Sequence, residues 1–359
     1  MDIQIIDLQN HSSWSQILQK LRHDLYHLPE YVAIEAKRTK TIPEAIVIAD
    51  GEKIFLAPYL LRSCDDILPQ ESNQKIFDVV SPYGYPGILL SEAAINTPEF
   101  ANQALDEFKH ILRENNVCAA FFRMHPILNH NLEQIFSPDT FTANGETVSV
   151  DLTLSEPQIW AHTRKGHQST INKCKRLGFT GRIVSYPQYI NEFIAIYEET
   201  MNRVKAKKSY YFNRDYFEDL AKLGEKIHLC LIELDNEIAS ACLFFECCGI
   251  VQAHLGGTRN QFLTSSPFNL MLDYVRYWAK ERGNQFLHLG GGIGGSTEDS
   301  LYIFKSGFSR QKHNFMTLRL IIDEEKYSYL VKCRAKALNK QSSEEIINSD
   351  FFPAYRFLT

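Results

Sequence analysis

The stretch best suited to chemistry is the glycine-rich block FLHLGGGIGGSTEDSLYIFKSGF, residues 286–308. Its apolar start, 286–289, predicts a buried strand, and five glycines follow within the six positions 290–295. Because glycine loses more conformational entropy on folding than any other residue, this density indicates a sharp turn or a close approach of the backbone to another group. Lys305 follows in the setting Phe-Lys-Ser-Gly-Phe, and its cation is suited to stabilising an oxyanion or binding a phosphate. We therefore expect a site at this block, with Lys305 as the charge.

Three of these glycines, Gly290, Gly292 and Gly295, also satisfy the dinucleotide-binding spacing G-x-G-x-x-G. That motif requires a βαβ unit after the glycines and an acidic residue about 20 positions on; too little chain remains, and no acid lies there. A P-loop is excluded because no Lys-Ser or Lys-Thr pair directly follows the glycines. Two interpretations remain, and we expect both to hold. The backbone of Gly291 and Gly292 lies close to a substrate, and a bulge at the strand end splays two strands.

Charge is distributed unevenly along the chain, whose net charge is -5. No Asp or Glu lies from Pro157 to Asn191. The basic residues of that span are Arg164, Lys165, Lys173, Lys175, Arg176 and Arg182, and a second basic group comprises Arg203, Lys205, Lys207 and Lys208. Such clusters form either a solvated basic face or a surface for a polyanion such as phosphate or RNA, and the sequence favours neither. In the second case, Arg164, Lys165 and Lys173 are the expected phosphate contacts.

Length and composition are those of a globular chain with two domains or one large one. With 359 residues the chain can bury sizeable cores, and no apolar run approaches the roughly 20 residues that span a bilayer. The start MDIQIIDLQN is acidic and alternating, so no signal peptide is expected. The eight cysteines form no C-x-x-C pair, which predicts a cytoplasmic protein with reduced, packing cysteines and neither a disulfide framework nor a metal site.

The order of the predicted elements repeats in the two halves of the chain. The first half predicts a helix at 30–37, a hairpin around Asp50-Gly51, a strand at 76–80, the turn-rich segment 81–87, a helix from Pro98 and a strand at 117–122. The second half opens with a helix from Glu156 that Gly178 can end. It then predicts a helix at 214–223, a hairpin around Asp235-Asn236, a strand at 250–255, a helix from Ser266 and a strand at 286–289. A repeat of this size implies two domains of one fold.

Each repeat places a hairpin and a strand before a helix and a further strand. Each sheet is therefore expected to be mixed, antiparallel first and parallel at its end. A strand–helix–strand crossover after a meander is the pattern of GNAT domains. The predicted fold class is α/β with mixed sheets, in two tandem GNAT-like domains related by an internal repeat. We place the first at 1–150, completed by the tail 335–359, and the second, with the catalytic and donor side, at 151–334.

The run VQAHLGG…SSPFNLMLDYVRYWAKERGNQFLHLGGGIGG…LYIFKSGF resembles the second domain of the Fem family of non-ribosomal peptidyltransferases. The shared pattern is an aromatic-rich strand ending in glycine, a helix, a strand running into Gly-Gly, and a Phe-Lys-x-x-Phe. The likeness spans nearly the whole chain. Residues 165–178 are similar to the basic helix that opens the family's second domain, and 31–37 and 81–87 to first-domain elements that help to bind the precursor. The chain departs from the family at His288, where an acidic residue is usual, and has no room for a long helical hairpin between Gly178 and Ile227.

The resemblance implies transfer of an aminoacyl group from aminoacyl-tRNA to an amine of a peptidoglycan precursor or a similar acceptor, in cell-wall synthesis, without a further cofactor. The acceptor amine is expected on a peptide or nucleotide-linked substrate, including one at a membrane surface. Lys305 matches the family's lysine, and His288 is a candidate acceptor for the amine's proton. The residues expected at the substrate are Lys37, Tyr83, Tyr85, Tyr211, Arg214, His254, Arg259, Gly291 and Gly292. Ordinary packing is the competing interpretation for the histidines and tyrosines.

Two other functions stay open. GNAT enzymes that use acyl-CoA hold its pyrophosphate on a glycine-rich loop before the helix that begins here near Ser266. The corresponding segment, TRNQFLTSSPFN, contains Arg259 but no glycine, and Pro267 lacks a donor N–H, so aminoacyl-tRNA is favoured over CoA. Ser265 and Ser266 are instead expected to cap the helix. The other alternative is a catalytically degenerate double-GNAT module that binds a polyanion through its basic clusters.

Overall fold

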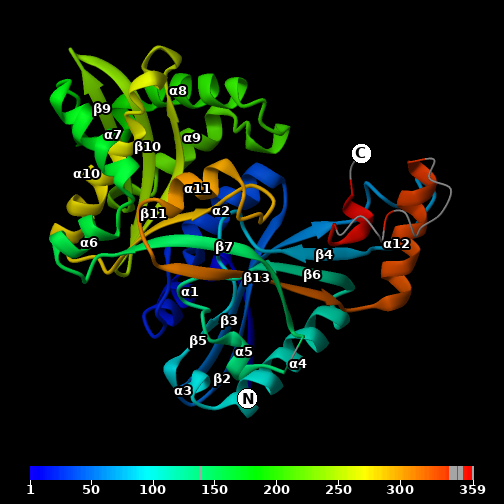
Figure 1. The fold of residues 1–359 in the computed structure, drawn as a ribbon. Coiled ribbons are helices and arrows are strands. Elements are labelled where there is room, and N and C mark those ends of the chain that lie inside the picture. Colours follow the sequence, from blue (N-terminus) through cyan, green and yellow to red (C-terminus); the bar gives the residue numbers. More distant parts are fainter. Residues whose placement is uncertain (138, 339–345, 347–350, 358–359) are drawn as a thin grey trace. The chain divides into compact units, whose positions relative to one another are not determined.

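The computed structural model describes residues 1–137, 139–338, 346 and 351–357. The chain divides into two compact units, Met1–Asn144 with Phe315–Thr359, and Gly145–Asn314. Each unit contains strands of a mixed sheet and helices that pack on them (Figure 1). All eight cysteines are free thiols. In the described part of the chain, no helix combines the length and the apolar character needed to cross a membrane.

The first unit is built from the first 144 residues of the chain and from residues after Asn314. Its elements are β1 (Asp2–Asp7), α1 (His11–Leu18), α2 (Pro29–Thr39), β2 (Ile42–Asp50), β3 (Lys53–Ser63), β4 (Phe77–Val80), β5 (Leu89–Leu90), α3 (Glu92–Ile95), α4 (Pro98–Glu114), β6 (Val117–Arg123), α5 (Leu132–Ile135), most of β13 (Lys312–Ile321) and α12 (Glu324–Ala337). Gly51, with a φ of 62°, turns the β2–β3 hairpin as the Asp-Gly pair predicts. Pro98 opens α4 in its first turn.

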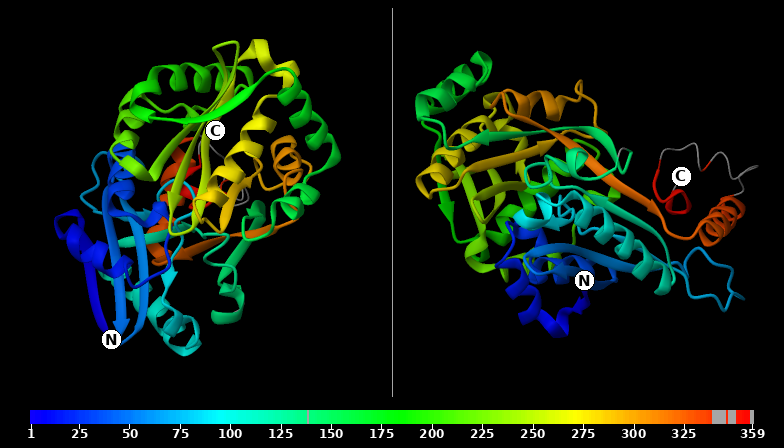
Figure 2. Two further views of the ribbon diagram at one scale, coloured as in Figure 1. Left: turned by 90° about the vertical axis from the view of Figure 1, so that its left-hand side faces the viewer. Right: turned by 90° about the horizontal axis from the view of Figure 1, so that it is seen from below.

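In the first unit the strands follow the order β1-β2-β3-β4-β6-β13, with β5 beside β3. The pair β4–β6 is parallel and the others are antiparallel. The apolar face of α4 packs into the core through Phe100, Leu105 and Phe108. A second core lies between β6 and α12, where Cys118 and Ala119 meet Leu330 and Val331. Figure 2 gives two further views of these elements.

The second unit holds the middle of the chain. Its elements are most of β7 (Phe141–Asp151), α6 (Glu156–His162), α7 (Lys165–Arg176), β8 (Thr180–Val184), α8 (Ile190–Arg203), α9 (Arg214–Ala221), β9 (Ile227–Leu234), β10 (Glu237–Cys247), β11 (Ile250–Thr258), α10 (Phe268–Glu281), β12 (Phe286–Gly291) and α11 (Ser300–Ser306). Asp235 and Asn236 both have positive φ, 50° and 64°, and turn the β9–β10 hairpin. Gly283, at φ 81°, follows the C-terminus of α10.

The strands of the second unit follow the order β8-β9-β10-β11-β12-β7. Only β11–β12 is parallel. One face of this sheet forms an apolar core with α6, α7, α10 and α11, through Ile159, Ile171, Met271 and Tyr302. Helix α8 packs on β10 and β11 from the other face and also contacts α9. The left view of Figure 2 shows α10 (yellow) lying across these strands.

The strands of the two units match one by one, which confirms the predicted mixed α/β fold and its internal repeat. In each, an outer strand is followed by the hairpin, an antiparallel strand, its parallel partner and a last antiparallel strand. The last strand comes from an unexpected part of the chain. β7 follows β6 in sequence but completes the sheet of the second unit beside β12, and β13 follows α11 but pairs with β6. Residues 315–334, which the sequence assigns to the second domain, accordingly lie in the first unit.

Two predicted elements differ in their bounds. The helix from Glu156 to Gly178 is two helices, because the chain turns at Thr163 and Arg164 between α6 and α7. There the N–H of Arg164 donates to the carbonyl oxygen of Gly307 at 2.8 Å instead of continuing α6. The strand predicted at 250–255 continues through two glycines to Thr258 as β11.

Candidate functional site

The parallel strands β11 and β12 separate partway along their length. They pair only over 250–252 and 286–288, and Gln252 opposite His288 is the last pair. Beyond it, β11 stays paired with β10 and β12 with β7, the latter after a register shift between His288 and Gly290. Among the described residues, the facing edges of the two strands have no strand partner there, so their backbone groups are suited to hydrogen-bond an inserted substrate. The predicted bulge that splays two strands is confirmed.

Lys305 reaches this splayed end, which we define as 253–258 of β11 and 289–291 of β12. Its Nζ donates a hydrogen bond of 2.7 Å to the carbonyl oxygen of Gly291. Burial lowers the pKa of Lys305 to about 8, against smaller raising effects of the Cys242 thiol and the Asp299 carboxylate. At neutral pH the side chain is therefore a poorly solvated cation. Such a charge stabilises a developing anion more strongly than a cation in water does.

His167 holds the helix that carries Lys305. Its Nε2 lies 2.8 Å from the carbonyl oxygen of Phe304, and its ring centroid lies 4.6 Å from that of Phe308. Burial lowers the pKa of His167, so the neutral ring donates this bond. A Cβ on Gly307 would lie 2.5 Å from His167 Nε2, which explains the glycine of the Phe-Lys-x-x-Phe segment. The two phenylalanines thus pack on a histidine of α7, a contact that no spacing in the sequence indicates.

The glycines of the block make room for the protein's own chain. Asp299 caps α11, and its Oδ1 accepts N–H groups from the glycine-rich loop and from α11 at 3.1 and 3.0 Å. A Cβ on Gly292 would lie 2.2 Å from this oxygen, and a Cβ on Gly291 would lie 2.7 Å from the carbonyl oxygen of Glu146. Internal packing is sufficient to account for both glycines. Their contact with a substrate stays a prediction. The Asp-x-x pattern before an apolar run was the available signal for the cap.

His288 lies on the opposite face of the sheet from Lys305. Its neighbours Leu287 and Leu289 belong to the core under α10 and α11, and successive residues of a strand point to opposite faces. The buried ring places Nδ1 2.5 Å from Oε1 of Gln252. Because the amide oxygen accepts this bond, Nδ1 holds the proton and Nε2 carries the lone pair. This tautomer can accept a proton next to the point where the strands separate.

His254 shares the face of His288 and belongs to an aromatic cluster. Its ring stacks on Phe245 at 4.2 Å between centroids, and its Nε2 lies 3.2 Å from the hydroxyl oxygen of Tyr216. Tyr216 in turn stacks on Phe212 at 4.5 Å. Tyr216 is not among the predicted residues, because nothing in the sequence distinguishes it from the other aromatic residues of this segment.

Three predicted substrate residues of the second unit have local partners. Tyr211 donates to Oδ1 of Asn202 at 2.9 Å, from the surface. Arg214 bonds the carboxylate of Glu218 at 2.7 Å, one turn along α9. The last of the three, Arg259, lies at the end of β11 with its guanidinium 3.8 Å from the Glu199 carboxylate of α8. The structure therefore does not bring these side chains together with Lys305.

The start of α10 does not form the predicted serine cap. A 3-10 helix, Asn260–Ser265, precedes it, Ser266 is left-handed at φ 51°, and Pro267 is the N-cap residue without a side-chain bond to the helix. The hydroxyl of Ser266 donates to the carbonyl oxygen of Leu263 at 3.3 Å. The expectation that serines cap this helix is wrong, because the chain enters α10 through the preceding 3-10 helix.

Helix α7 presents the basic cluster as an exposed face. His167, Ile171 and Cys174 form its buried side. The predicted phosphate contacts Arg164, Lys165 and Lys173 are all exposed. Because Arg164 precedes α7 where His167 meets α11, the basic face begins beside the helix of Lys305. The structure thus groups Arg164 and Lys165, but not Lys173, near the Phe-Lys-x-x-Phe segment.

The predicted residues of the first unit lie on and beside a clamped loop. In the segment 81–87, the N–H and carbonyl oxygen of Tyr83 bond Glu35 and Tyr31 at 3.3 and 2.9 Å. His27, whose pKa burial lowers to about 3, bonds the carbonyl oxygen of Pro86. Tyr85 meets Phe315 edge to face at 5.3 Å. Lys37, the remaining predicted substrate residue of this unit, is exposed in the last turn of α2.

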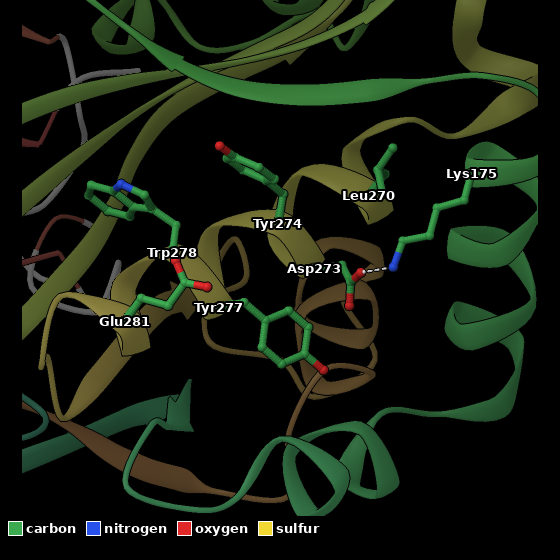
Figure 3. Close-up of a pocket in the computed structure, with 7 residues that line it drawn as sticks. All are labelled: Lys175, Leu270, Asp273, Tyr274, Tyr277, Trp278 and Glu281. Carbon is green, nitrogen blue, oxygen red and sulfur yellow. Dashed lines mark hydrogen bonds and ion pairs between the residues drawn. The ribbon is translucent and has the colours of Figure 1, made fainter.

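A surface pocket of 290 Å³ lies between α7 and α10 (Figure 3). Its lining residues are Lys175, Leu270, Asp273, Tyr274, Tyr277, Trp278 and Glu281. The Lys175 ammonium and the Asp273 carboxylate form an ion pair of 2.7 Å across it. In the sequence Lys175 is only one member of the basic cluster, and the pocket could not be predicted because its walls come from two helices that lie about 90 residues apart in the chain.

Comparison with known proteins supports the fold and the class of chemistry. Residues 161–299 match the family described as "Acetyltransferase (GNAT) domain". No curated protein matches the chain in sequence. The structure of FemX is similar with a TM-score of 0.70 and 14% identity, over 92% of this chain and 99% of that chain.

Two further structures resemble the chain less closely. They are L-PGS from Bacillus licheniformis, with a TM-score of 0.53 and 13% identity over 89% of this chain and 94% of that one, and a conserved protein of unknown function from Bacteroides thetaiotaomicron, with 0.54 and 10% over 89% and 100%. The prediction of a Fem-like GNAT fold is confirmed. The match to the GNAT domain family lies within the second unit and ends just before α11, the helix of Lys305.

Proposed function

We propose that this chain, an acyltransferase of Fem-like GNAT fold, transfers an aminoacyl group from aminoacyl-tRNA to an amine. The observation that carries the proposal is the splayed end of β11 and β12 with the desolvated cation of Lys305 beside it. Acyl transfer needs a bound, extended acyl donor and a charge where the oxyanion develops. The facing strand edges, which are not paired with each other beyond Gln252 and His288, supply hydrogen-bonding groups for the first, and Lys305 supplies the second.

The reaction forms one amide and releases one hydroxyl group. The uncharged amine nitrogen attacks the ester carbonyl carbon of the aminoacyl-tRNA, so a C–N bond forms and negative charge develops on the carbonyl oxygen. Collapse breaks the C–O bond to the ribose, and the amine proton ends on the ribose oxygen. Lys305 stabilises the oxyanion. His288, with its lone pair on Nε2, is the proposed carrier of the proton between the two, from the end of the paired region.

Two features favour tRNA over CoA as the donor's carrier. The chain reaches α10 through a 3-10 helix and Pro267, with no glycine loop whose N–H groups could surround a pyrophosphate. The basic face of α7 instead offers dispersed cations, Arg164 and Lys165 among them, to an extended polyanion. Acyl-CoA remains the second candidate donor, because the matched domain family is one of acetyltransferases.

We propose that residues of the first unit bind the acceptor. Its loop 81–87 is held by buried groups and presents the half-buried rings of Tyr83 and Tyr85, and Lys37 offers a cation to a phosphate. A rigid aromatic loop with a nearby cation suits a nucleotide-linked peptide. We therefore propose a peptide amine of a peptidoglycan-precursor type as the acceptor.

Donor consumption by the purified protein tests this function. Total tRNA charged with labelled amino acids and labelled acetyl-CoA are offered in parallel, each with a nucleotide-linked peptide that carries a free amine. We expect label from tRNA to appear on the peptide, with loss of the transfer in Lys305→Met. Transfer from acetyl-CoA alone would select the second donor. Binding of tRNA without transfer from either donor would indicate a catalytically degenerate module.

A further inference from the structure

The pocket between α7 and α10 has walls suited to a flat ring. Tyr274, Tyr277 and Trp278 occur at spacings of three and four residues, which place them along one side of α10. Figure 3 shows the three rings around the hollow. At 290 Å³ the pocket lies at the small end of ligand sites, so it has room for one planar ring system.

Neighbouring groups hold these rings in place before any ligand arrives. Tyr274 packs so closely on β8 that a Cβ on Gly181 would lie 2.8 Å from its ring. The guanidinium of the fully buried Arg276 lies 5.0 Å from the ring centroid of Tyr277. Trp278 meets His228 edge to face at 4.7 Å. Rings fixed in this way lose little conformational entropy when a second ring stacks on them.

The charged groups at the pocket balance, with Lys175 and Arg276 against Asp273 and Glu281, so the pocket suits a neutral ring. The Asp273 carboxylate pairs with two cations, Lys175 at 2.7 Å and Arg276 on the other oxygen. It is thereby neutralised, and Lys175 remains as a wall of the pocket. The carboxylate of Glu281 lies on the exposed last turn of α10, where it can accept a hydrogen bond from an amino group of the ring.

The pocket borders the basic face of α7. Lys165, Lys173 and Arg176 are exposed on this helix, and Lys175 follows the same helix into the pocket. At 100° per residue, Lys165, Lys173 and Arg176 fall within one quarter of the helix surface, and Arg176 is next to Lys175. No acidic residue interrupts this face, since none occurs from Pro157 to Asn191. Phosphates along α7 would place the attached bases beside α10.

We propose that this pocket binds one unstacked base of an RNA strand whose phosphates lie along the basic face of α7. The proposal rests on the proposed function and deepens it, since the RNA is the tRNA of the donor. The base stacks on the tyrosines and tryptophan, and its amino group donates to Glu281. Aromatic stacking of this kind tolerates every base, which suits an enzyme that reads its donor by shape and position.

The experiment compares a short single-stranded RNA with an abasic strand of the same length. Fluorescence anisotropy of the labelled strands gives the affinities at several salt concentrations. We expect wild type to bind the base-containing strand about tenfold tighter than the abasic strand. Tyr277→Ala abolishes this difference, and Tyr277→Phe retains it. Binding of the base-containing strand also quenches tryptophan fluorescence, and Trp278→Phe removes that signal.

Two controls separate the pocket from the basic face. Tyr189→Ala is matched to Tyr277→Ala, because Tyr189 is also half-buried with an arginine, Arg182, 5.2 Å from its ring centroid. It leaves the preference for bases unchanged. A Lys165→Gln, Lys173→Gln and Arg176→Gln triple variant weakens both strands equally and flattens the salt dependence.

Any one of three results would overturn the proposal that the pocket binds a base. Wild type binds both strands equally, Tyr277→Ala keeps the preference, or choline rather than RNA quenches Trp278. If both strands bind equally but through the basic face, the pocket proposal fails while the proposed tRNA donor stands. If neither strand nor charged tRNA binds, the proposed function fails with it.

Discussion

The parallel strand pairs of the two units occupy equivalent places in their sheets but end differently. In the first unit, β4 and β6 stay joined to their ends. After Val80 pairs with Phe121, the N–H of Ser81 donates to the carbonyl oxygen of Phe121 at 2.9 Å, and its hydroxyl accepts the N–H of Arg123 at 3.1 Å. In the second unit, β11 and β12 stop pairing at Gln252 and His288.

This difference supports the proposal that the second unit carries the acyl transfer. The closed pair, β4 and β6, leads into loop 81–87. The backbone groups of this loop already hydrogen-bond the side chains of Tyr31, Glu35 and His27. The splayed pair leaves strand edges for a ligand and has Lys305 beside it. In the proposed function, one fold supplies a rigid platform in one unit and a site for chemistry in the other.

Of the changes that test this comparison, removal of the Lys305 cation should have the largest effect on turnover. Lys305→Met keeps the aliphatic stem and removes the charge, so we expect turnover to fall by about 10²–10³, as for the loss of one oxyanion donor. The melting temperature should not fall, since the buried ammonium is itself poorly solvated. Initial rates and thermal unfolding of the same preparation measure both.

Lys280→Met is the matched control for this variant. Lys280 also donates from a helix of the second unit to a backbone carbonyl, that of Leu152 at 2.8 Å, but away from the splayed end. Its substitution should leave turnover within about twofold of wild type. Equal losses of turnover in the two variants would show that any lysine bonded to a backbone carbonyl supports activity. The assignment of Lys305 as the stabilising charge would then be wrong.

Gly257 tests whether the splayed end depends on the close approach of α8. A Cβ there would lie 2.5 Å from Oγ1 of Thr200 and 2.7 Å from the carbonyl oxygen of Ile196. Gly257→Ala should therefore lower the free energy of unfolding by about 1–3 kcal/mol, because a helix backbone must shift. Gly166→Ala on α7, where nothing lies within 4 Å, should instead raise it by up to about 1 kcal/mol. Denaturant unfolding measures both, and effects of the same sign would contradict this account.

The repeat and the splayed strand could be predicted because both depend on local signals. Asp50-Gly51 and Asp235-Asn236 mark hairpins by turn chemistry, and the glycines after Leu289 mark a strand end. The positions of β7 and β13 could not be predicted, because the pairing partner of a strand is set by the whole sheet rather than by its own residues.

The site was predicted in part for the same reason. Lys305 lies within its motif, whereas His167, which fixes the lysine's helix, is distant in sequence and meets it only through folding. His288 was singled out by its place near the glycines, but alternation along β12 puts it on the face opposite Lys305. Spacing identifies a motif, and only the sheet decides which face each residue occupies.

The pH dependence separates a charged lysine from a neutral base. Since the pKa of Lys305 is lowered to about 8, a reaction that needs its charge should lose about tenfold in kcat/KM per pH unit above that value. Stability should change in the opposite direction. The unfolded lysine keeps its proton up to about pH 10.4, so the unfolded state binds more protons between 8 and that value, and the free energy of unfolding rises with pH.

The difference between wild type and Lys305→Met isolates this contribution. Buried thiols such as Cys230, whose pKa burial raises, titrate equally in both proteins and cancel. If the rate rose through pH 8 in wild type but not in Lys305→Met, Lys305 would act as a general base and not as a stabilising cation.

Ser81→Ala should have the smallest effect and tests the closed pair. The hydroxyl of Ser81 is buried and accepts the N–H of Arg123, so its loss leaves a buried donor and should lower the free energy of unfolding by about 1 kcal/mol. Ser63→Ala removes an equally long bond of 3.1 Å to a backbone N–H at an exposed position, where water replaces it, and should change stability by less than about 0.5 kcal/mol. Neither variant should alter turnover. If Ser81→Ala slowed the reaction as strongly as a change at the splayed end, the closed pair would share in the chemistry, and the division of roles between the two units would have to be abandoned.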